Sequence, residues 1–437
     1  MNQIPLEDVQ GLILRGYGMD ALRIFVLHIE QAAQARRLLA CIPITSAVIW
    51  DKKPDFCVNI AITYDGLQAL GLDNNMLESF PDDFRQGAAA RAVNVGDVGD
   101  SAPENWKAGL GGSGVHVLVL LFAKNGDTRQ EQSQLLRELW KGVMSELPHH
   151  DGDVLPGNVV HFGFRDGLSQ PTIAGAPPNP VPDTQPQAPA GEFLLGYQSQ
   201  FTQFTYAVPS PPQLGLNGSF LALRILAQDC AAFETLLNEA PEKYSISGEM
   251  LAAKMVGRWR SGVPLVMSPT TDSPNPPIQT EDLNNYDYAN DDEGEKCPIG
   301  SHMRRANPRN TLVAGAGGSK HRIVRRGVPY GPPFDPAHPD DGVERGLVGL
   351  FIGVSLKDQF EFIMSNWVNG SIFAAGLSGT KDVLLGDISD GTGKFNIPLH
   401  GEKPLVVSGF SRLVRTRGAA YAFIPSISSL KFISNIS

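Results

Sequence analysis

Apolar runs followed by segments of helical periodicity recur along the first part of the chain. Residues 21–30 (ALRIFVLHIE) are rich in Leu, Ile, Val and Phe, and the segment after them has apolar positions at helical spacing. The same order recurs at residues 58–64, and at residues 115–123 before a helical segment that we expect to end near Leu147. The pattern predicts repeated strand-then-helix units in the first half.

The second half of the chain repeats this order. An apolar run at residues 217–226 (NGSFLALRIL) precedes a helical pattern, and residues 345–356 (RGLVGLFIGVSL) precede a second one, KDQFEFIMSNWV. Two segments built in this way are compatible with a duplicated α+β domain whose antiparallel sheet is covered on one face. Spacing alone leaves a parallel α/β fold open.

Proline-rich sequence separates the two halves. Residues 174–190 read AGAPPNPVPDTQPQAPA, and each proline removes an amide donor that a helix or a central strand would need. We therefore expect a first domain at residues 1–173, a linker at 174–190 and a second domain at 191–437. The stretch 269–309 also has the composition of a loop, and loops of this length usually carry function.

Composition limits the classes of partner. The chain has 437 residues, of which 42% are hydrophobic, which is enough for a sizeable core and more than one domain. Its net charge of −10 argues against a nucleic-acid-binding protein, which needs clustered Lys and Arg. The strongest apolar run, residues 115–123, is shorter than the roughly 20 residues of a membrane-spanning helix. We expect small neutral or cationic molecules as partners, with no nucleic acid and no membrane.

The amino terminus and the cysteines indicate a compartment. The first twenty residues lack a basic segment followed by a long apolar one, so they do not resemble a secretory signal. The four cysteines, Cys41, Cys57, Cys230 and Cys297, show neither CxxC nor CxxCH spacing. We expect reduced cysteines in a cytoplasmic protein, with unconventional export or encapsulation as alternatives.

Two short segments carry candidate chemistry that is weak when each is taken alone. HFGFRDGLSQP, residues 161–171, contains Asp166 in a GxxDG pattern, and Asp-Gly more often marks a turn. CPIGSHMRRANPR, residues 297–309, places His302 between glycine and proline residues rather than on an apolar helical face. A lone histidine is more often a surface or core residue than a ligand.

A third segment completes the set. HRIVRRGVPYGPP, residues 321–333, places Arg325 and Arg326 before a Gly-Val-Pro-Tyr-Gly turn, which alone would be a basic pair beside a turn. With all three segments present in this order, the sequence resembles the dye-decolourising peroxidase family along nearly its whole length. The segments GEFLLGY at residues 191–197, VNIAITYDGLQALGL and NGSFLALRIL add to the resemblance.

This resemblance implies a fold, a cofactor and a reaction. The expected fold is α+β with two ferredoxin-like domains, each an antiparallel sheet covered by helices. The expected cofactor is noncovalent haem b, held mainly by the second domain. The expected activity is the oxidation of dyes, phenols and similar small aromatic electron donors by hydrogen peroxide.

The resemblance also assigns roles to residues. His302 matches the axial ligand of the haem iron, Asp166 the distal acid, and Arg325 the distal arginine, with Arg326 as a less favoured alternative. In peroxide chemistry one oxygen loses a proton and the other gains one before it leaves as water. Asp166 would act first as general base and then as general acid, and Arg325 would stabilise the developing negative charge.

Further residues are expected around the haem. The second nitrogen of the axial imidazole should be anchored by a carboxylate, for which Asp382 in KDVLLG is the candidate, with an exposed aspartate as the alternative. Arg309 and His321 are candidates for contacts with the haem propionates, since guanidinium and imidazolium groups pair with carboxylates. Leu350 and Phe351 match an apolar distal lid, although buried strand residues would look the same.

Bulky dyes cannot reach a buried iron, so surface-reachable aromatic side chains are candidates for an electron relay. Tyr330 follows Arg325 in the expected turn, and Trp367 lies in the expected helix FEFIMSNW. A packing role is the alternative for both. Two other functions also stay open: a haem-binding or iron-releasing protein without peroxidase turnover, and a non-catalytic assembly protein, against which the presence of Asp166, His302 and Arg325 speaks.

Overall fold

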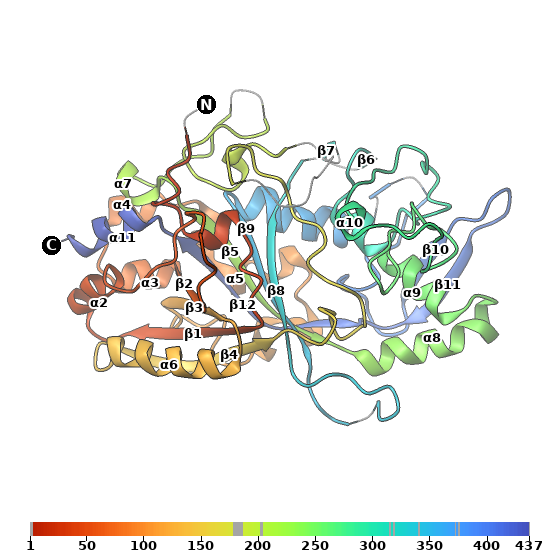
Figure 1. The fold of residues 1–437 in the computed structure, drawn as a ribbon, viewed down its shortest axis with the longest axis horizontal. Helices are drawn as coiled ribbons and strands as arrows, with labels where there is room; N and C mark the ends of the chain where they lie inside the picture. Colours follow the sequence, from red (N-terminus) through yellow and green to blue (C-terminus); the bar gives the residue numbers. More distant parts are fainter. Residues whose placement is uncertain are drawn as a thin grey trace.

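A twisted antiparallel sheet organises the protein in the computed structural model (Figure 1). The structure describes residues 3–177, 187–201, 204–313, 316–317, 320–339, 341–371, 373–374 and 376–436. The strands of this eight-stranded sheet are β1 (Ala21–Ile29), β2 (Phe56–Ile62), β3 (Val117–Ala123), β4 (Met144–Asp153), β5 (Ser219–Gln228), β8 (Val324–Tyr330), β9 (Gly346–Gly353) and β12 (Val414–Ile424). Two small sheets pair β6 (Leu312–Val313) with β7 (Ala316–Gly317), and β10 (Gly393–Ile397) with β11 (Leu405–Phe410).

Helices cover the sheet and extend it at one end. The α-helices are α1 (Gly11–Leu14), α2 (Ala32–Leu39), α3 (Tyr64–Ala69), α4 (Asn74–Glu78), α5 (Asp82–Ala90), α6 (Gly126–Trp140), α7 (Pro212–Gly215), α8 (Cys230–Tyr244), α9 (Gly248–Val256), α10 (His302–Ala306) and α11 (Ile427–Ser434). The 3₁₀ turns are η1 (Ala92–Val95), η2 (Gly99–Ser101), η3 (Pro103–Asn105), η4 (Ala190–Glu192) and η5 (Thr280–Asp282). The segments η6 (Leu356–Glu361) and η7 (Ile363–Val368) are π-helical, a wide geometry that is frequent at functional sites.

The sheet consists of two halves with the same topology. Its strand order is β4-β1-β3-β2 followed by β12-β5-β9-β8, so each half has its first, second, third and fourth strands in the order 4-1-3-2. The halves join where Ile62 of β2 pairs with Phe423 of β12. This is the duplicated ferredoxin-like α+β fold that was expected, and it excludes the parallel alternative.

The two outer strands of the sheet also approach each other. A Cβ atom added to Gly152 of β4 would lie 3.0 Å from the carbonyl oxygen of Pro329 in β8. The sheet therefore curves towards a barrel. Its interior is filled by leucines and other buried apolar side chains from both halves, among them Leu22, Leu118 and Leu223.

Two local expectations were wrong. The helix that was expected to end near Leu147 ends at Trp140, because Gly142 takes a φ of +74° there and β4 begins at Met144. The expected turn after Arg326 is part of strand β8 and contains Pro329. Since β8 is the last strand of the sheet, Pro329 can lie there with its missing amide facing no neighbouring strand.

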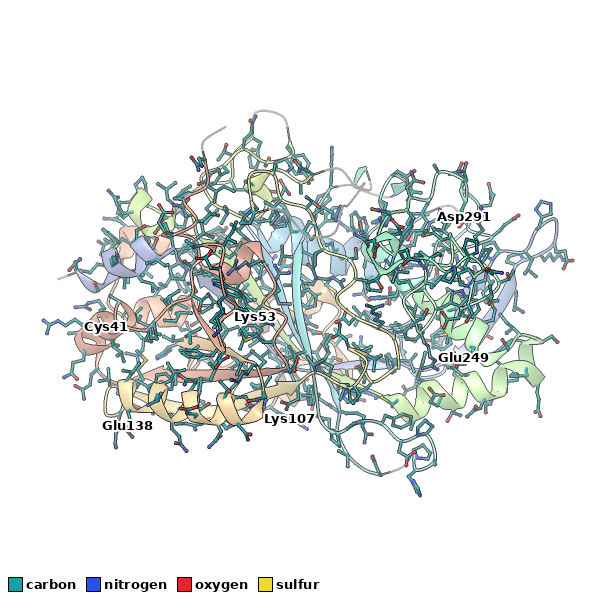
Figure 2. The ribbon with its side chains drawn as sticks, in the orientation of Figure 1. Cys41, Lys53, Lys107, Glu138, Glu249 and Asp291 are labelled. Carbon is teal, nitrogen blue, oxygen red and sulfur yellow. The ribbon has the colours of Figure 1, made fainter. Side chains whose placement is uncertain are left out.

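The remaining expectations concern boundaries and surfaces. Most of the expected linker at 174–190 lies outside the described residues, so the domain limits at 173 and 191 stay predictions. The four cysteines are free thiols, and Cys41 is exposed at the periphery (Figure 2). In the part of the chain that the structure describes, no helix combines the length and apolar character needed to cross a membrane.

Candidate active site

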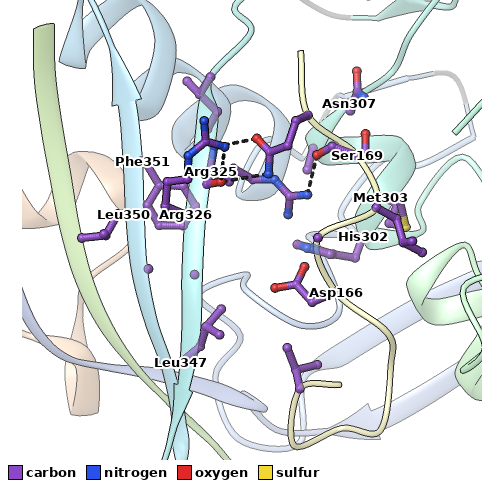
Figure 3. Close-up of a pocket in the computed structure, with 18 of the residues that line it drawn as sticks. Asp166, Ser169, His302, Met303, Asn307, Arg325, Arg326, Leu347, Leu350 and Phe351 are labelled. Atoms are coloured by element: carbon purple, nitrogen blue, oxygen red, sulfur yellow. Dashed lines mark hydrogen bonds between the residues drawn. The ribbon is translucent and has the colours of Figure 1, made fainter. Parts of the chain in front are cut away.

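A cavity of about 780 Å³ brings most of the expected site residues together. Its wall combines the loop 158–171, the helix α10, the strands β8 and β9, and the π-helical segments η6 and η7. The expected residues that line it are Asp166, His302, Arg309, His321, Arg325, Leu350, Phe351 and Trp367. Figure 3 shows the side chains of Asp166, His302 and Arg325 converging on one space.

His302 is the first residue of α10, and a buried carboxylate fixes its ring. Its Nδ1 donates a hydrogen bond of 3.0 Å to Oδ2 of Asp382. The second carboxylate oxygen, Oδ1, accepts hydrogen bonds of 2.9 Å from the backbone amides of Leu384 and Leu385. Because Nδ1 is occupied, Nε2 is the ring nitrogen that remains for a ligand.

The Asp382 carboxyl is fully buried, yet its surroundings favour the charged form. Burial alone would raise its pKa, but the His302 imidazole, the Leu385 amide and the Arg305 guanidinium together lower the pKa below its ordinary value. A charged carboxylate on Nδ1 makes the opposite nitrogen a better electron donor. Asp382 therefore makes the contact that was expected of it, and it is not an exposed aspartate.

The backbone of Asp166 is fixed while its carboxylate is free. Its amide donates a 2.9 Å hydrogen bond to the carbonyl of Asn158, and its carbonyl accepts one of 3.1 Å from Asn158 Nδ2. Among the described residues, no group forms a hydrogen bond or ion pair with the carboxylate of Asp166. An unpartnered carboxylate on a cavity wall is available for proton transfer to a bound molecule.

Arg325 is positioned by the residues that follow Asp166 in the chain. Its Nη2 donates a 3.1 Å hydrogen bond to the carbonyl of Ser169. The amide side chain of Gln170 accepts from the Arg325 amide at 3.1 Å and donates to the Arg325 carbonyl at 2.8 Å, so it pairs with the edge of β8 as a neighbouring strand would. The acid and the arginine thus belong to one connected unit.

Alternation along β8 separates the two neighbouring arginines. Arg325 is paired across the ladder with Phe351, and Arg326 with Leu350, so each pair faces a different side of the sheet. Figure 3 shows Arg325 towards His302 and Asp166, whereas Leu350 points away from them. Arg325 is therefore the arginine of the site. Of the two expected lid residues, Phe351 shares its side, and Leu350 borders the cavity on the side of Arg326.

Arg309 and His321, the two residues expected to contact the haem propionates, line the cavity. Much of their hydrogen-bonding capacity is already used by other residues. The guanidinium of Arg309 donates to Asn284 and to the carbonyl of Tyr286, and it lies 3.8 Å from the centre of the Tyr286 ring. His321 Nδ1 contacts the carbonyl of Asp358, and burial lowers the pKa of its imidazole. A neutral His321 donating through Nδ1 would present Nε2 only as an acceptor.

The two candidate relay residues differ in position. Trp367 has 1% of its surface exposed and packs against His321, so the expectation that it reaches the surface was wrong. The helix that carries it turns this face towards the cavity. Tyr330 is half-buried, and its hydroxyl lies 3.4 Å from Oε1 of Glu344. Burial and the Glu344 charge raise the pKa of the Tyr330 phenol.

Sequence reasoning missed the groups that hold the GxxDG loop. Arg260, from the second half, donates to the carbonyl of Phe162, and its own carbonyl accepts from the Arg165 amide at 3.0 Å. Gly163 has a φ of +82°, and a Cβ atom there would lie 2.4 Å from Arg260 Nη1. Gln170 was within the quoted motif, but no local signal connects it with Arg325, because such contacts are made only by the fold.

The cavity suits a haem. A planar, largely apolar macrocycle with two carboxylates needs apolar walls, one axial ligand and buried cations. Two guanidinium nitrogens of lining residues, Arg258 Nη2 and Arg309 Nε, are buried without a hydrogen-bond partner among the described residues. The described residues also contain no cluster of three His, Cys, Asp or Glu side chains able to hold a metal alone.

Known proteins resemble this chain over almost its whole length. Residues 8–156 match the family model described as the DyP dimeric alpha+beta barrel domain. The chain is 29% identical to the dye-decolorizing peroxidase msp1 of Mycetinis scorodonius, over 99% of its own length and 88% of that protein. It is 25% identical to the multifunctional dye peroxidase DyP2 of an Amycolatopsis species, over 98% of its own length and 95% of that protein.

Solved structures agree. A dye-decolorizing peroxidase in complex with 2,6-dimethoxyphenol superimposes with a TM-score of 0.85 at 27% identity, covering 99% of this chain and 100% of that one. The enzyme of Auricularia auricula-judae gives a TM-score of 0.84 at 28% identity, with the same coverage. The fold and the site thus define a peroxidase of the haem-enzyme class. The family model, the curated relatives and the solved structures all point to the dye-decolorizing peroxidase family.

Proposed function

We propose that this peroxidase binds haem b without covalent bonds and that Asp166, Arg325 and His302 carry its activity. The observation that supports this best is the arrangement around one cavity: a free carboxylate and an arginine converge with a histidine whose Nδ1 is held by Asp382. When bound, the haem supplies the redox-active iron that takes up the oxidising equivalents of hydrogen peroxide. The electron donors are small aromatic molecules such as phenols, as the relative crystallised with 2,6-dimethoxyphenol suggests.

The chain offers suitable contacts for each part of the cofactor. His302 Nε2 would hold the iron, and the apolar side chains of Phe351, Met364 and Leu385 would contact the macrocycle. Arg258 and Arg309 carry the buried unpartnered nitrogens that suit propionates. No cysteine is among the described residues that line the cavity, which favours noncovalent binding.

Asp166 and Arg325 have different roles in the reaction with hydrogen peroxide. Asp166 accepts a proton from one peroxide oxygen and returns it to the other, which leaves as water. Arg325 Nε and Nη1 have no partner among the described residues, so they are available to stabilise negative charge as the O–O bond breaks. Its position is fixed beforehand by Ser169 and Gln170, so no reorganisation is needed at that moment.

The pH dependence of the peroxide reaction separates the two roles. Losing general acid–base help typically costs about 10²–10⁴-fold and losing one electrostatic stabiliser about 10²–10³-fold, so magnitudes overlap. If Asp166 is the base, the rate falls on the acid side as the carboxylate is protonated, and Asp166→Asn loses that limb. Arg325→Leu keeps it, because arginine stays protonated throughout.

Stopped-flow absorption after mixing with peroxide measures this rate, with haem content checked for each variant. Asp127→Asn, on the exposed face of α6, is the control and should behave as the native protein. If Asp166→Asn reacts at native speed while Arg325→Leu is nearly inactive, the acid–base assignment is wrong and the arginine carries activation.

A further inference from the structure

The cavity continues past the edge of β8 to a region that the peroxide reaction does not use. Besides the residues around His302, its lining includes Gly16, Tyr17, Gly18 and Phe122 from the first half, together with Arg326. These residues lie on the side of the sheet that Arg326 faces, opposite to Arg325. β8 is the last strand of the sheet, and the lining of the cavity includes residues on both of its faces.

Arg326 is a part-buried cation that has no counter-ion among the described residues. Its Nε donates to the Leu12 carbonyl at 3.2 Å and its Nη1 to the Arg325 carbonyl at 3.3 Å, and it forms no salt bridge with a carboxylate in the described part of the chain. Burial lowers the pKa of its guanidinium to about 10, which still leaves it charged at neutral pH. A part-buried guanidinium with donors left over can form charge-assisted hydrogen bonds with a bound anion.

Fully buried arginines of this protein are held by a carboxylate or by several oxygens, although Arg224, Arg304 and Arg305 each keep a buried Nε without a partner among the described residues. Arg224 pairs with Asp97 at 2.6 Å, and Arg304 pairs with Asp291 at 3.0 Å. Arg305 also lacks a carboxylate, but it donates to oxygens of Trp367, Gly370 and Thr380. Arg326 makes only two long hydrogen bonds to carbonyls, and its Nη2 has no partner among the described residues.

The path from the surface to Arg326 is open because glycine lines it. Gly16 is exposed, and a Cβ atom added there would lie 3.9 Å from the guanidinium carbon of Arg326, so nothing but backbone separates the two. The rings of Tyr17 and Phe122 meet edge to face and provide an apolar wall. The Tyr17 hydroxyl already donates to Asn59 at 2.7 Å, so its ring is the part that remains for packing.

We infer that this groove, formed by Gly16, Tyr17, Gly18, Phe122 and Arg326, binds an aromatic carboxylate, with the carboxylate on Arg326 and the ring against Tyr17 and Phe122. Arginine is suited to this task because its fork of donors matches a carboxylate. Such a molecule would lie on the face of β8 opposite to Arg325. The groove therefore favours acidic phenols over neutral ones as electron donors. Their role as electron donors rests on the proposed function, whereas their binding to the groove can be tested without it.

Charges at the rim modify this preference without reversing it. Arg325 and Arg15 add positive charge near the groove, since both act on the Tyr17–Arg326 region. Asp20 is the acid on the same wall, and its exposed position places its charge in water, where screening is strong.

Binding can be measured on the haem-loaded protein without peroxide. Calorimetric titration with 4-hydroxybenzoate and with its neutral methyl ester compares two ligands that differ in one charge. We expect the acid to bind about 10- to 100-fold more tightly, the range of a charge-assisted hydrogen-bonded contact. Arg326→Gln should remove this difference and retain the affinity for the ester.

Two further variants locate the site. Gly16→Val should weaken binding of both ligands, because its side chain fills the groove above the guanidinium, and Gly16 does not have a positive φ that would strain a valine. This variant keeps the test decisive if Arg326→Gln does not fold. Lys320→Gln removes another cation of the cavity wall and should leave the preference for the acid intact.

Several results would overturn the inference. Equal affinity of the native protein for acid and ester would refute it, as would a preference that survives Arg326→Gln or disappears in Lys320→Gln. The Soret response to peroxide is measured separately on the same samples. A normal response without any preference for the acid refutes the groove alone, whereas a missing response refutes the proposed function.

Discussion

The contact between His302 and Asp382 gives the sharpest expectation for a single substitution. Asp382→Asn preserves the shape of a fully buried side chain, and its amide oxygen can still accept from the backbone amides of Leu384 and Leu385. The amide nitrogen then faces His302 Nδ1, which is itself a donor. To avoid two opposed donors, the imidazole must move its proton to Nε2, the nitrogen needed by the iron.

The size of the effect follows from the bonds that are lost. A hydrogen bond to a charged group contributes about 1.5–3 kcal/mol, and about 1.4 kcal/mol corresponds to a factor of ten in affinity. Haem affinity should therefore fall about 10- to 150-fold. This agrees with the roughly 10- to 100-fold cost of removing a group that orients a metal ligand.

The assay is a titration of the apoprotein with haem, followed by the Soret absorption. Asp387→Asn is the matched control, because Asp387 lies in the same segment and pairs with Lys381 but does not contact His302. It should bind haem as the native protein does. If Asp382→Asn binds haem with native affinity and an unchanged ferric spectrum, the carboxylate does not control the ligand and the reasoning fails.

Three further predictions concern other parts of the molecule. Tyr330→Phe should slow the oxidation of bulky dyes and spare small donors, because only the capacity of the phenol to carry a radical is removed; equal losses in steady-state rates on both would contradict a surface relay. Gln170→Leu should release Arg325 and slow the stopped-flow reaction with peroxide about tenfold, with haem content unchanged; a native rate would contradict this positioning. His150, whose burial lowers its pKa to about 4, binds fewer protons in the folded than in the unfolded state between that value and pH 6.5. As pH falls through this window, the free energy of unfolding of the native protein should therefore decrease by up to about 3 kcal/mol relative to His150→Gln, and identical urea denaturation profiles over pH would exclude this linkage.

The sequence predicted the strand-then-helix units of both halves well, because apolar periodicity is a local signal, whereas the antiparallel topology was expected only from the family resemblance. β1, β3, β5 and β9 are continuous apolar runs, and all four lie where such runs were seen. β4 was missed, because its sequence MSELPHHDGD has few apolar residues and its strand character comes from pairing with β1. A strand that forms by pairing with a distant part of the chain has no local signal in the sequence.

The site was predictable only in part for a similar reason. Asp166, His302 and Arg325 lie in recognisable motifs, and the structure brings them to one cavity. Their supports depend on contacts over long distances in the chain, such as Arg260 on the GxxDG loop and Gln170 on β8. Whether a side chain such as Trp367 is buried also depends on the whole fold, so the sequence alone did not predict it.

The absorption spectrum of the protein loaded with haem tests the central claim most directly, when the native chain and His302→Ala are compared at equal protein concentration. The account predicts a Soret band in the native protein that shifts on addition of peroxide and returns when a dye is added. It predicts loss of most bound haem in His302→Ala, because the substitution removes the imidazole that Asp382 orients towards the cavity. A native protein without a Soret band after reconstitution, or a fully occupied His302→Ala with an unchanged ferric spectrum, would contradict the account.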